Sequence, residues 1–227
     1  MASNMPTNEA FEFDSIPKAI EAFARGEFLV VVDNEDRENE GDLIISAAHM
    51  TPAKMAFMVR HTSGVICTPM KPERLEELKL PLMVQENEDT HKTAFTITAD
   101  YRHGTTTGIS AHDRSVTVRA MADPSCTASD FNRPGHLFPL RYTPGGVCVR
   151  GGHTEASIDL CELAGLYPVG VLCELVNEDG SMSRRDDCRS FAQKHGMCMI
   201  SISDLALYRK RMGIDSSSSS SCSTSTA

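Results

Sequence analysis

The densest charge in the chain is the run 33–42 (DNEDRENEGD), in which six carboxylates surround one arginine, Arg37. The run is entered from the apolar segment 28–32 and left through the apolar segment 43–47, and both flanks have the aliphatic and β-branched composition of buried strands. Acidic loops are often only solvated surface, but carboxylates held this close between two core strands favour a bound cation. Magnesium fits better than calcium, because a calcium loop would need a bidentate glutamate where Ala47 stands.

A second cluster has the composition of an anion site, and its sequence is Arg150-Gly151-Gly152-His153-Thr154. It precedes a helical pattern over 154–166, for which Thr154 is the expected cap. Glycines let the backbone approach a ligand, the helix start favours negative charge, and Arg150 supplies a bidentate cation. A plain glycine turn before a helix would look similar. His153 favours the site, because an imidazole placed there could reach a metal or a substrate.

Weaker signals come from single residues in apolar or turn segments. Glu174 interrupts the apolar run 169–176, and a buried carboxylate must be paired, protonated or used, whereas an outward-facing Glu on a half-exposed strand would need no function. His136 follows a Pro-Gly turn ahead of an apolar strand, where a histidine is usually on the surface. Cys67 is most simply a small buried residue. The turn 105–108 (TTTG) offers hydroxyls and amides that could hold sugar oxygens.

Composition limits the class of protein. A length of 227 residues suits one large domain or two small ones, and nothing marks an internal boundary. With 31 acidic against 22 basic residues and no tryptophan, the chain lacks the clustered Lys and Arg of a nucleic-acid groove. The eight cysteines occur singly and are expected to be reduced. No segment approaches the ~20 apolar residues of a membrane helix, and no signal or transit segment is visible. We therefore expect a cytoplasmic protein with no nucleic-acid or membrane partner.

The elements that must position these residues alternate between strands and helices. A helix is predicted between Ser15 as cap and Gly26 as stop, and the last helix is predicted to be capped by Ser203. The other predicted helices are 51–60, 71–80, 113–121, 154–166 and 184–195, and the predicted strands are 28–32, 43–47, 64–68, 95–101, 135–142, 169–176 and 198–201. This alternation predicts an α+β fold with a single-domain mixed β-sheet covered by helices in a three-layer α/β/α sandwich. We expect a loose segment at 1–14, a catalytic domain at 15–212 and a disordered Ser/Thr-rich tail at 213–227.

Four motifs in order carry a family resemblance: 36–42 (DRENEGD), 106–110 (TTGIS), 133–136 (RPGH) and 150–155 (RGGHTE). Together they resemble the 3,4-dihydroxy-2-butanone 4-phosphate synthases of riboflavin biosynthesis, over about residues 15–212. Members of this family convert ribulose 5-phosphate into a four-carbon phosphoketone and formate. The resemblance implies the monofunctional form, without the cyclohydrolase domain that is sometimes fused to it.

The resemblance also implies roles for individual residues. Glu38 and His153 are expected to hold magnesium, with manganese as the alternative metal. The expected substrate-binding residues are Arg37, Asp42, Thr107, Arg150, Gly151, Gly152, His153, Thr154 and Glu174. The expected catalytic residues are Glu174, His136, Asp42, Glu38 and Cys67. The family's dimeric form implies a homodimer with shared active sites, and the expected partner is a small phosphosugar.

Two other functions fit part of the pattern. A metal-dependent phosphosugar isomerase or aldolase would use the same cation and phosphate cradle but would release no formate. A non-catalytic acidic binding module would need the acidic run without convergence of Arg150, His153 and Glu174. Assay of formate after incubation with ribulose 5-phosphate and magnesium distinguishes these alternatives.

Overall fold

The structure is a computed structural model that describes residues 12–214. Seven strands within that range form one mixed sheet in the order β4-β5-β3-β6-β2-β1-β7. They are β1 (Leu29–Val32), β2 (Gly41–Ser46), β3 (Cys67–Met70), β4 (Ala99–Tyr101), β5 (Phe131–Arg141), β6 (Gly170–Glu174) and β7 (Cys198–Ser201). β1 pairs with β7 and β3 pairs with β5 in parallel, and the other neighbours are antiparallel. The predicted tail at 213–227 and loose segment at 1–14 lie almost wholly outside the described residues.

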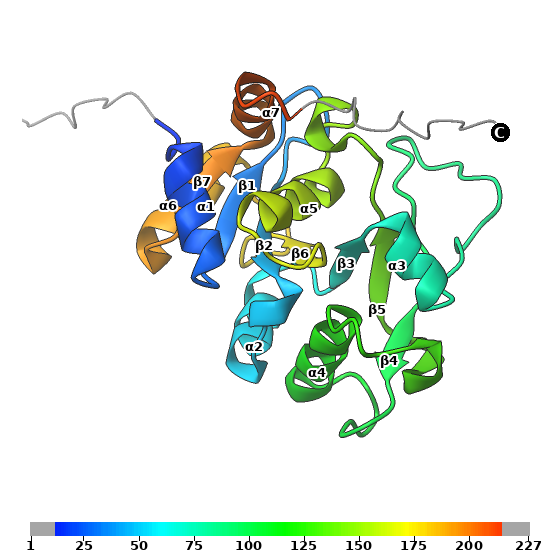
Figure 1. Ribbon diagram of the computed structural model, residues 1–227. Coiled ribbons are helices and arrows are strands. Elements are labelled where there is room, and N and C mark those ends of the chain that lie inside the picture. Colours follow the sequence, from blue (N-terminus) through cyan, green and yellow to red (C-terminus); the bar gives the residue numbers. More distant parts are fainter. Residues whose placement is uncertain (1–11, 215–227) are drawn as a thin grey trace, which may run out of the picture.

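Helices cover both faces of this sheet (Figure 1). They are α1 (Ile16–Ala24), α2 (Pro52–His61), α3 (Pro72–Glu77), α4 (Ala111–Met121), α5 (His153–Leu163), α6 (Arg185–His195) and α7 (Ile202–Arg211). One buried cluster joins the sheet to α1, α5 and α7, and a second joins its other face to α2, α3, α4 and α6. The prediction of a three-layer α/β/α sandwich is confirmed.

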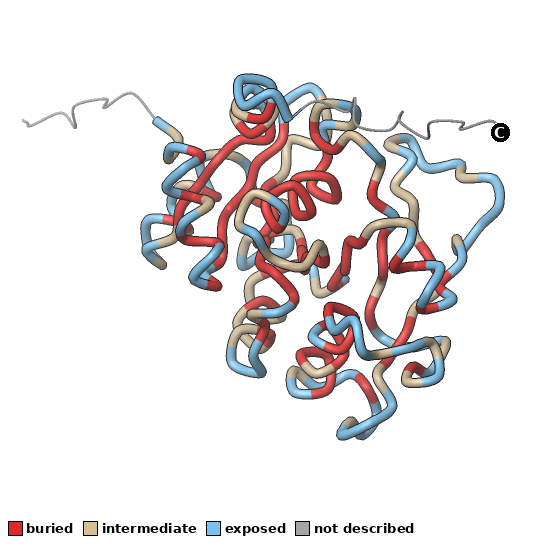
Figure 2. Tube along the Cα trace, viewed as in Figure 1, coloured by how far each residue is buried: buried red, intermediate tan, exposed pale blue. Residues whose placement is uncertain are grey.

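The alternation of side chains along β1 explains the two layers. Val30 and Val32 pack into one buried cluster, and Leu29 and Val31 pack into the other. All four are at most 2 % exposed, so the strand is uniformly apolar in sequence because both of its faces are covered. Figure 2 shows the buried strands in red, with exposed residues concentrated on the outer helix surfaces and loops.

Local sequence signals predicted several boundaries correctly. Thr51 caps α2 by accepting a hydrogen bond from the Lys54 amide, as predicted, and Gly26 ends the first helix with a φ of 82°. Segment 113–121, whose pattern favoured a helix only weakly, is helical within α4.

Other boundaries were predicted wrongly. Ser201, and not Ser203, caps α7, because the Ser201 hydroxyl accepts from the Asp204 amide while the Ser203 hydroxyl donates to Asn34 Oδ1. α5 begins at His153 after an extended Gly152, so Thr154 lies in its first turn and is not the cap.

Three strands also differ from the prediction, and one of them, β5, begins at Phe131, four residues earlier than predicted. β3 begins at Cys67, three residues later than predicted, and β4 keeps only its last three residues, Ala99–Tyr101, because Phe95 and Thr96 form isolated bridges.

Strand register brings the acidic run to the centre of the sheet. Asp42, at the start of β2, lies opposite Val31 of β1 and opposite Glu174 of β6. β2 and β6 are both interior strands, so these two carboxylates approach each other across the middle of the fold.

None of the helices in the described part of the chain combines the length and the apolar character needed to cross a bilayer.

Candidate active site

A pocket of about 310 Å³ opens where the β1–β2 connection, β6 and the start of α5 meet. Its lining residues are Arg37, Glu38, Glu40, Asp42, Cys67, Thr93, Phe95, Leu140, Arg150, His153, Thr154, Leu172 and Glu174. Eight of the twelve residues predicted from the sequence line it. Gly151 and Gly152 lie in the turn directly before α5, whereas His136 and Thr107 lie elsewhere. The structure therefore brings most of the predicted residues together in one pocket.

Asp33 fixes the shape of the acidic connection. Its side chain is almost completely buried, and it accepts hydrogen bonds from Arg37 Nη1 at 2.9 Å and from the backbone amides of Glu38 at 3.0 Å and Glu40 at 2.9 Å. Asp33, Glu38 and His153 lie close enough together to form a metal-binding cluster. The oxygens of Asp33 are already occupied by these donors, so its role is to hold the loop that presents Glu38.

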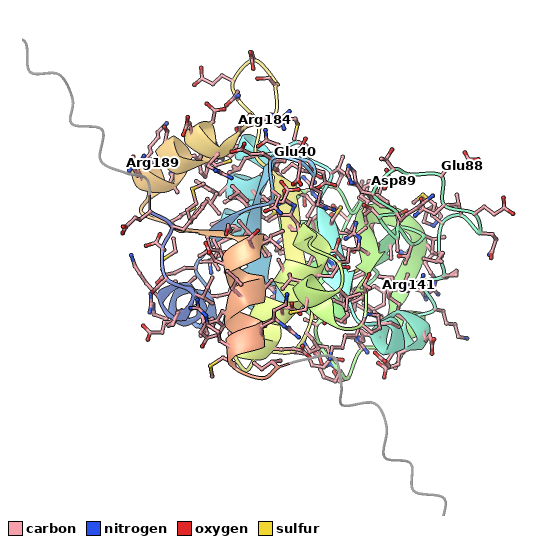
Figure 3. The ribbon with its side chains drawn as sticks, turned by 90° about the horizontal axis from the view of Figure 1, so that it is seen from above. Glu40, Glu88, Asp89, Arg141, Arg184 and Arg189 are labelled. Atoms are coloured by element: carbon pink, nitrogen blue, oxygen red, sulfur yellow. The ribbon has the colours of Figure 1, made fainter. Side chains whose placement is uncertain are left out.

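The outer side of the same loop is held by Arg184. Its guanidinium donates to the backbone carbonyls of Glu38 at 2.9 Å and Asn39 at 2.5 Å, and it lies 4.0 Å from Glu40. Figure 3 shows Arg184 and Glu40 close together at this edge of the molecule. Asn39 has a positive φ of 54°, which asparagine tolerates better than most residues, so the loop turns tightly between these two anchors.

His153 is oriented by the strand beneath it. Its Nε2 lies 3.0 Å from the Val31 carbonyl oxygen, and because a carbonyl only accepts, Nε2 must carry the proton. Nδ1 then faces Glu38 Oε2 at 3.6 Å and Asp42 Oδ1 at 3.7 Å. A metal-ligating histidine usually donates its other N–H in this way, so Nδ1 of His153 and the carboxylate of Glu38 form a preoriented pair of ligand atoms.

Asp42 is the buried carboxylate with the fewest compensating contacts in this pocket. It is 2 % exposed, and its Oδ1 has no hydrogen-bond partner among the described residues. Burial raises the pKa of Asp42 to about 8, with the charges of Glu174, Glu38 and Glu40 adding to the rise and that of His153 opposing it. An orphaned buried oxygen in a pocket costs stability, and such sites are typical of ligand-binding or catalytic groups.

In Glu38 and His153, by contrast, the pKa shifts favour the charged form of the side chain. Burial alone would raise the pKa of Glu38, but the neighbouring His153 ring and the charge of Arg37 lower it to about 2. Burial likewise opposes charge on His153, yet the carboxylates of Asp42, Glu38 and Asp33 raise its pKa to about 9. The pocket therefore concentrates negative potential around the His153 ring, which is the environment a cation requires.

Two arginines converge at the start of α5. Arg150 donates from Nη1 to the buried Glu155 at 2.6 Å and from Nη2 to the His91 carbonyl and Thr93 Oγ1, each at 3.1 Å. A Cβ atom on Gly152 would overlap Arg150 Nη1 and lie 3.1 Å from Arg37 Nη2. Gly152 is therefore needed because both guanidinium groups fold over its backbone. Two cations beside a helix N-terminus form a suitable site for a phosphate group.

Glu174 is held by a serine that the sequence analysis missed. The Ser63 hydroxyl donates to Glu174 Oε2 at 2.5 Å, and the Ser63 amide donates to the Glu174 carbonyl oxygen at 2.8 Å. Cys67, 2 % exposed, lines the same pocket, and burial raises the pKa of its thiol well above the ordinary value. Cys67 therefore contributes a neutral thiol to the pocket wall.

His136 and Thr107 form a separate cluster around Asp100. His136 Nδ1 lies 2.6 Å from Asp100 Oδ2, and the His136 side chain is 42 % exposed. The turn that carries Thr107 is held by Asp113, which accepts from the amides of Thr106 and Gly108, both at 3.0 Å. Within the described part of the chain, this second cluster contributes nothing to the lining of the Glu38–His153 pocket.

The residues that sequence reasoning missed differ in how visible they were. Asp100 is an ionisable residue in a strand with a buried neighbour, Ala99, so the argument that identified Glu174 could have found it. Ser63 and Thr93 gave no signal, because each is a small polar residue in a loop whose position depends on tertiary structure.

Comparison with known proteins gave a consistent result. The family model described as 3,4-dihydroxy-2-butanone 4-phosphate synthase matches residues 17–208. A 3,4-dihydroxy-2-butanone 4-phosphate synthase of Schizosaccharomyces pombe is 57 % identical over 86 % of this chain and 97 % of its own length. A bifunctional riboflavin biosynthesis protein of Arabidopsis thaliana is 56 % identical, but the chain spans only 37 % of that protein.

Solved structures agree with the sequence comparisons. A crystal structure of a 3,4-dihydroxy-2-butanone 4-phosphate synthase in complex with two magnesium ions is similar with a TM-score of 0.85 and 49 % identity, covering 88 % of this chain and 99 % of that one. A cation-free form gives a TM-score of 0.84 with 46 % identity, covering 89 % of this chain and 100 % of that one.

Proposed function

The chain belongs to the 3,4-dihydroxy-2-butanone 4-phosphate synthase family, whose members include a riboflavin biosynthesis protein, and we propose that it catalyses the full synthase reaction. The proposed reaction is the magnesium-dependent conversion of D-ribulose 5-phosphate into L-3,4-dihydroxy-2-butanone 4-phosphate and formate. Membership of an enzyme family sets aside the alternative of a non-catalytic acidic binding module.

The observation that carries this proposal is the buried, unpartnered oxygen of Asp42 beside the preoriented Glu38–His153 pair. One carboxylate and one imidazole suit magnesium or manganese, which complete their coordination with water and substrate oxygens. We propose Glu38 and His153 as the protein ligands. When bound, the metal polarises oxygens of the sugar and stabilises negative charge that develops on them.

The positive charges and the glycine turn at the start of α5 suggest how the substrate would bind. Arg150 and the first turn of α5, with Gly151, Gly152 and Thr154, would hold the phosphate. Arg37 lies between that turn and the acidic loop, a position from which it would contact the sugar. A sugar extending from the phosphate site toward His153 would then lie between Asp42 and Glu174, the two carboxylates paired across β2 and β6.

Proton transfer is the main chemical task of the protein groups. Enolisation of the ketose removes a proton beside the carbonyl, and Asp42 or Glu38 is proposed as the base. Glu174, with its carboxylate held by Ser63, and His136 are proposed to move protons in the later steps. Loss of the C1 hydroxyl releases water, and hydrolytic release of C4 as formate consumes water. The atoms of substrate and products therefore balance without an oxidant or a reductant.

Cys67 is proposed to act as a neutral thiol. Its buried Sγ lies 3.5 Å from the Val65 carbonyl oxygen, to which it donates, and its raised pKa keeps the thiolate population small at neutral pH. A thiol in this state is a poor nucleophile, so we place Cys67 against the substrate as a shaping group with a weak S–H donor.

We propose a homodimer in which each pocket is completed by the partner subunit. The proposal is supported by the separation of His136 and Thr107 from the pocket and by the exposure of the His136 side chain. Ile109, in the same turn region, is 50 % exposed, and a partner subunit on this face would bury it. Each active site would then combine Glu38 and His153 of one subunit with His136 of the other.

Residues 15–212 are proposed to act as one catalytic domain, a range that contains the family match at 17–208. The seven cysteines within the described residues are all free, which supports a reducing compartment such as the cytoplasm.

The test is incubation with ribulose 5-phosphate and magnesium, followed by assay of formate with and without chelator. We expect formate only in the samples that contain magnesium, and we expect Glu38→Ala and His153→Ala to abolish it while the circular dichroism spectrum stays unchanged. Absence of formate in every magnesium-replete sample would reject the synthase function. Epimerised or cleaved sugar without formate would identify an isomerase or an aldolase.

A further inference from the structure

Asp100 lies at the base of an irregularity in the β4–β5 pair. Ala99 is paired with Leu137, but Asp100 is paired with Asn132. Residues 133–136 of β5 therefore form a bulge opposite the peptide bond between Ala99 and Asp100. Bulges of this kind re-aim side chains and often occur beside active sites. Here the bulge carries His136 over the Asp100 carboxylate.

Both carboxylate oxygens of Asp100 contact the same residue, His136. Its Oδ1 accepts from the His136 backbone amide at 2.8 Å, and its Oδ2 lies 2.6 Å from His136 Nδ1. A carboxylate only accepts, so Nδ1 of His136 carries the proton and Nε2 remains the free ring nitrogen. The Asp100 side chain is 11 % exposed and that of His136 is 42 % exposed, so the carboxylate is shielded while the imidazole is presented outward.

Two glycines make this arrangement sterically feasible. A Cβ atom on Gly135 would overlap the backbone of Ala99, and one on Gly108 would overlap Asp100 Oδ2 and lie 2.7 Å from His136 Nδ1. Gly108 also has a φ of 91°, which glycine adopts without strain. The 106–108 turn therefore packs directly on the Asp100–His136 pair and shields the bond between them.

We propose that Asp100 is the positioning residue for His136, holding its ring in the tautomer with a bare, outward-facing Nε2. This inference deepens the proposed function and rests on it, because His136 is there assigned to the later proton transfers. An imidazole with a bare Nε2 accepts a proton from the substrate first and returns it afterwards. The opposite tautomer would present a donor at that position and would be unable to begin this cycle.

Asp100→Asn tests the inference with almost no change in shape. The side-chain oxygen of the introduced asparagine must stay on the His136 backbone amide, because that amide needs an acceptor. The side-chain NH2 group then faces His136 Nδ1, which must become the acceptor, and the proton moves to Nε2. Loss of the correct tautomer through such a substitution sharply lowers turnover in other histidine-dependent enzymes. We expect kcat for formate release to fall at least about 100-fold, with an unchanged melting temperature.

The direct readout is the ring tautomer, which a merely structural role for Asp100 would leave unchanged. Full-length protein labelled with ¹⁵N-histidine would be examined by long-range ¹H–¹⁵N NMR at about pH 8, above the ordinary pKa of histidine. The His136 signals would be assigned from their loss in His136→Gln. The matched control is Asp130→Asn, in which Asp130 contacts the exposed His103 at 3.1 Å. We expect this control to retain wild-type turnover.

Each outcome decides the inference. A tautomer that inverts in Asp100→Asn together with the loss of kcat supports the positioning role. An uninverted tautomer, or an inverted tautomer with wild-type kcat, overturns it. If His136→Gln itself retains full activity, the proposed role of His136 fails as well, whereas a loss in His136→Gln with none in Asp100→Asn rejects only the inference about Asp100.

Discussion

Replacement of Asp42 by asparagine should stabilise the metal-free protein and inactivate the enzyme. Asp42 is 2 % exposed with an oxygen that lacks a donor among the described residues, and leaving such a group unpaired costs about 1–3 kcal/mol, or more when it is charged. Asparagine has the same shape without the charge that Glu38, Glu40 and Glu174 oppose. Because its oxygen still lacks a donor, we expect a net gain of about 2 kcal/mol, which is about 4–8 °C in melting temperature for a domain of this size.

Asp33→Asn is the matched control, because Asp33 is equally buried but fully bonded. Its oxygens accept three hydrogen bonds, from Arg37 Nη1 and from the amides of Glu38 and Glu40. Asparagine offers one oxygen in place of two, so at least one donor would face the amide NH2 group. We expect Asp33→Asn to lower the free energy of unfolding by about 1–3 kcal/mol. The same substitution should thus have opposite signs at two positions of one hairpin.

The assay is urea unfolding in chelator, combined with formate release in magnesium. The raised pKa of Asp42 means that its penalty is absent below its ordinary pKa of 3.8, grows as the pH rises from there to about 8, and is constant above that. The stability difference between Asp42→Asn and wild type should therefore increase with pH over this window, and turnover should fall at least about 100-fold. If Asp42→Asn is less stable than wild type, or keeps wild-type turnover, the reasoning about its unpaired oxygen is refuted.

Three further predictions concern other parts of the structure. Arg150→Lys should raise KM for ribulose 5-phosphate about tenfold or more and change kcat less, because lysine lacks the planar fork that contacts Glu155 and that is proposed to hold the phosphate; an unchanged KM would move the phosphate elsewhere. Inactive Glu38→Ala and His136→Ala proteins, unfolded together and refolded at equal amounts, should recover about a quarter of wild-type activity, because half of the dimers are hybrids with one intact site; no recovery would reject shared sites. Burial opposes the charge on Asp113, but hydrogen bonds from Thr106 and the Gly108 amide outweigh it and lower the pKa of Asp113, so its stabilising contribution is present above its unfolded pKa and is lost as the pH falls. The difference between the urea midpoints of Asp113→Asn and wild type should accordingly be largest at about pH 6 and shrink as the pH falls below the ordinary pKa of Asp113; a constant difference would contradict this.

The fold was predictable wherever the local pattern had a single physical explanation. The uniformly apolar β1 needed cover on both faces, and Thr51 before a proline could only start a helix. The prediction at Ser203 failed because Ser201 and Ser203 are both good caps, and only the parallel pairing of β7 with β1 decides where the strand ends. Local sequence carries no information about that choice.

The site was predictable in composition but not in geometry. The family resemblance named Glu38, His153 and Asp42, yet the local pattern gives no physical reason why Asp33, whose oxygens are bonded to the loop, differs from Asp42, whose Oδ1 is not. That difference depends on loop closure and strand register. The separation of His136 from the pocket, and its contact with Asp100, depends on the bulge in β5, which no local pattern specifies.

The central claim is that this pocket cleaves C4 from ribulose 5-phosphate as formate, and it is tested most directly with substrate labelled with ¹³C at C4. We expect the label to appear in formate by ¹³C NMR in the presence of magnesium, with an unlabelled four-carbon phosphoketone formed in equal amount and no conversion in excess chelator. Label that remains in a five-carbon sugar, or that appears in any cleavage product other than formate, would contradict the account.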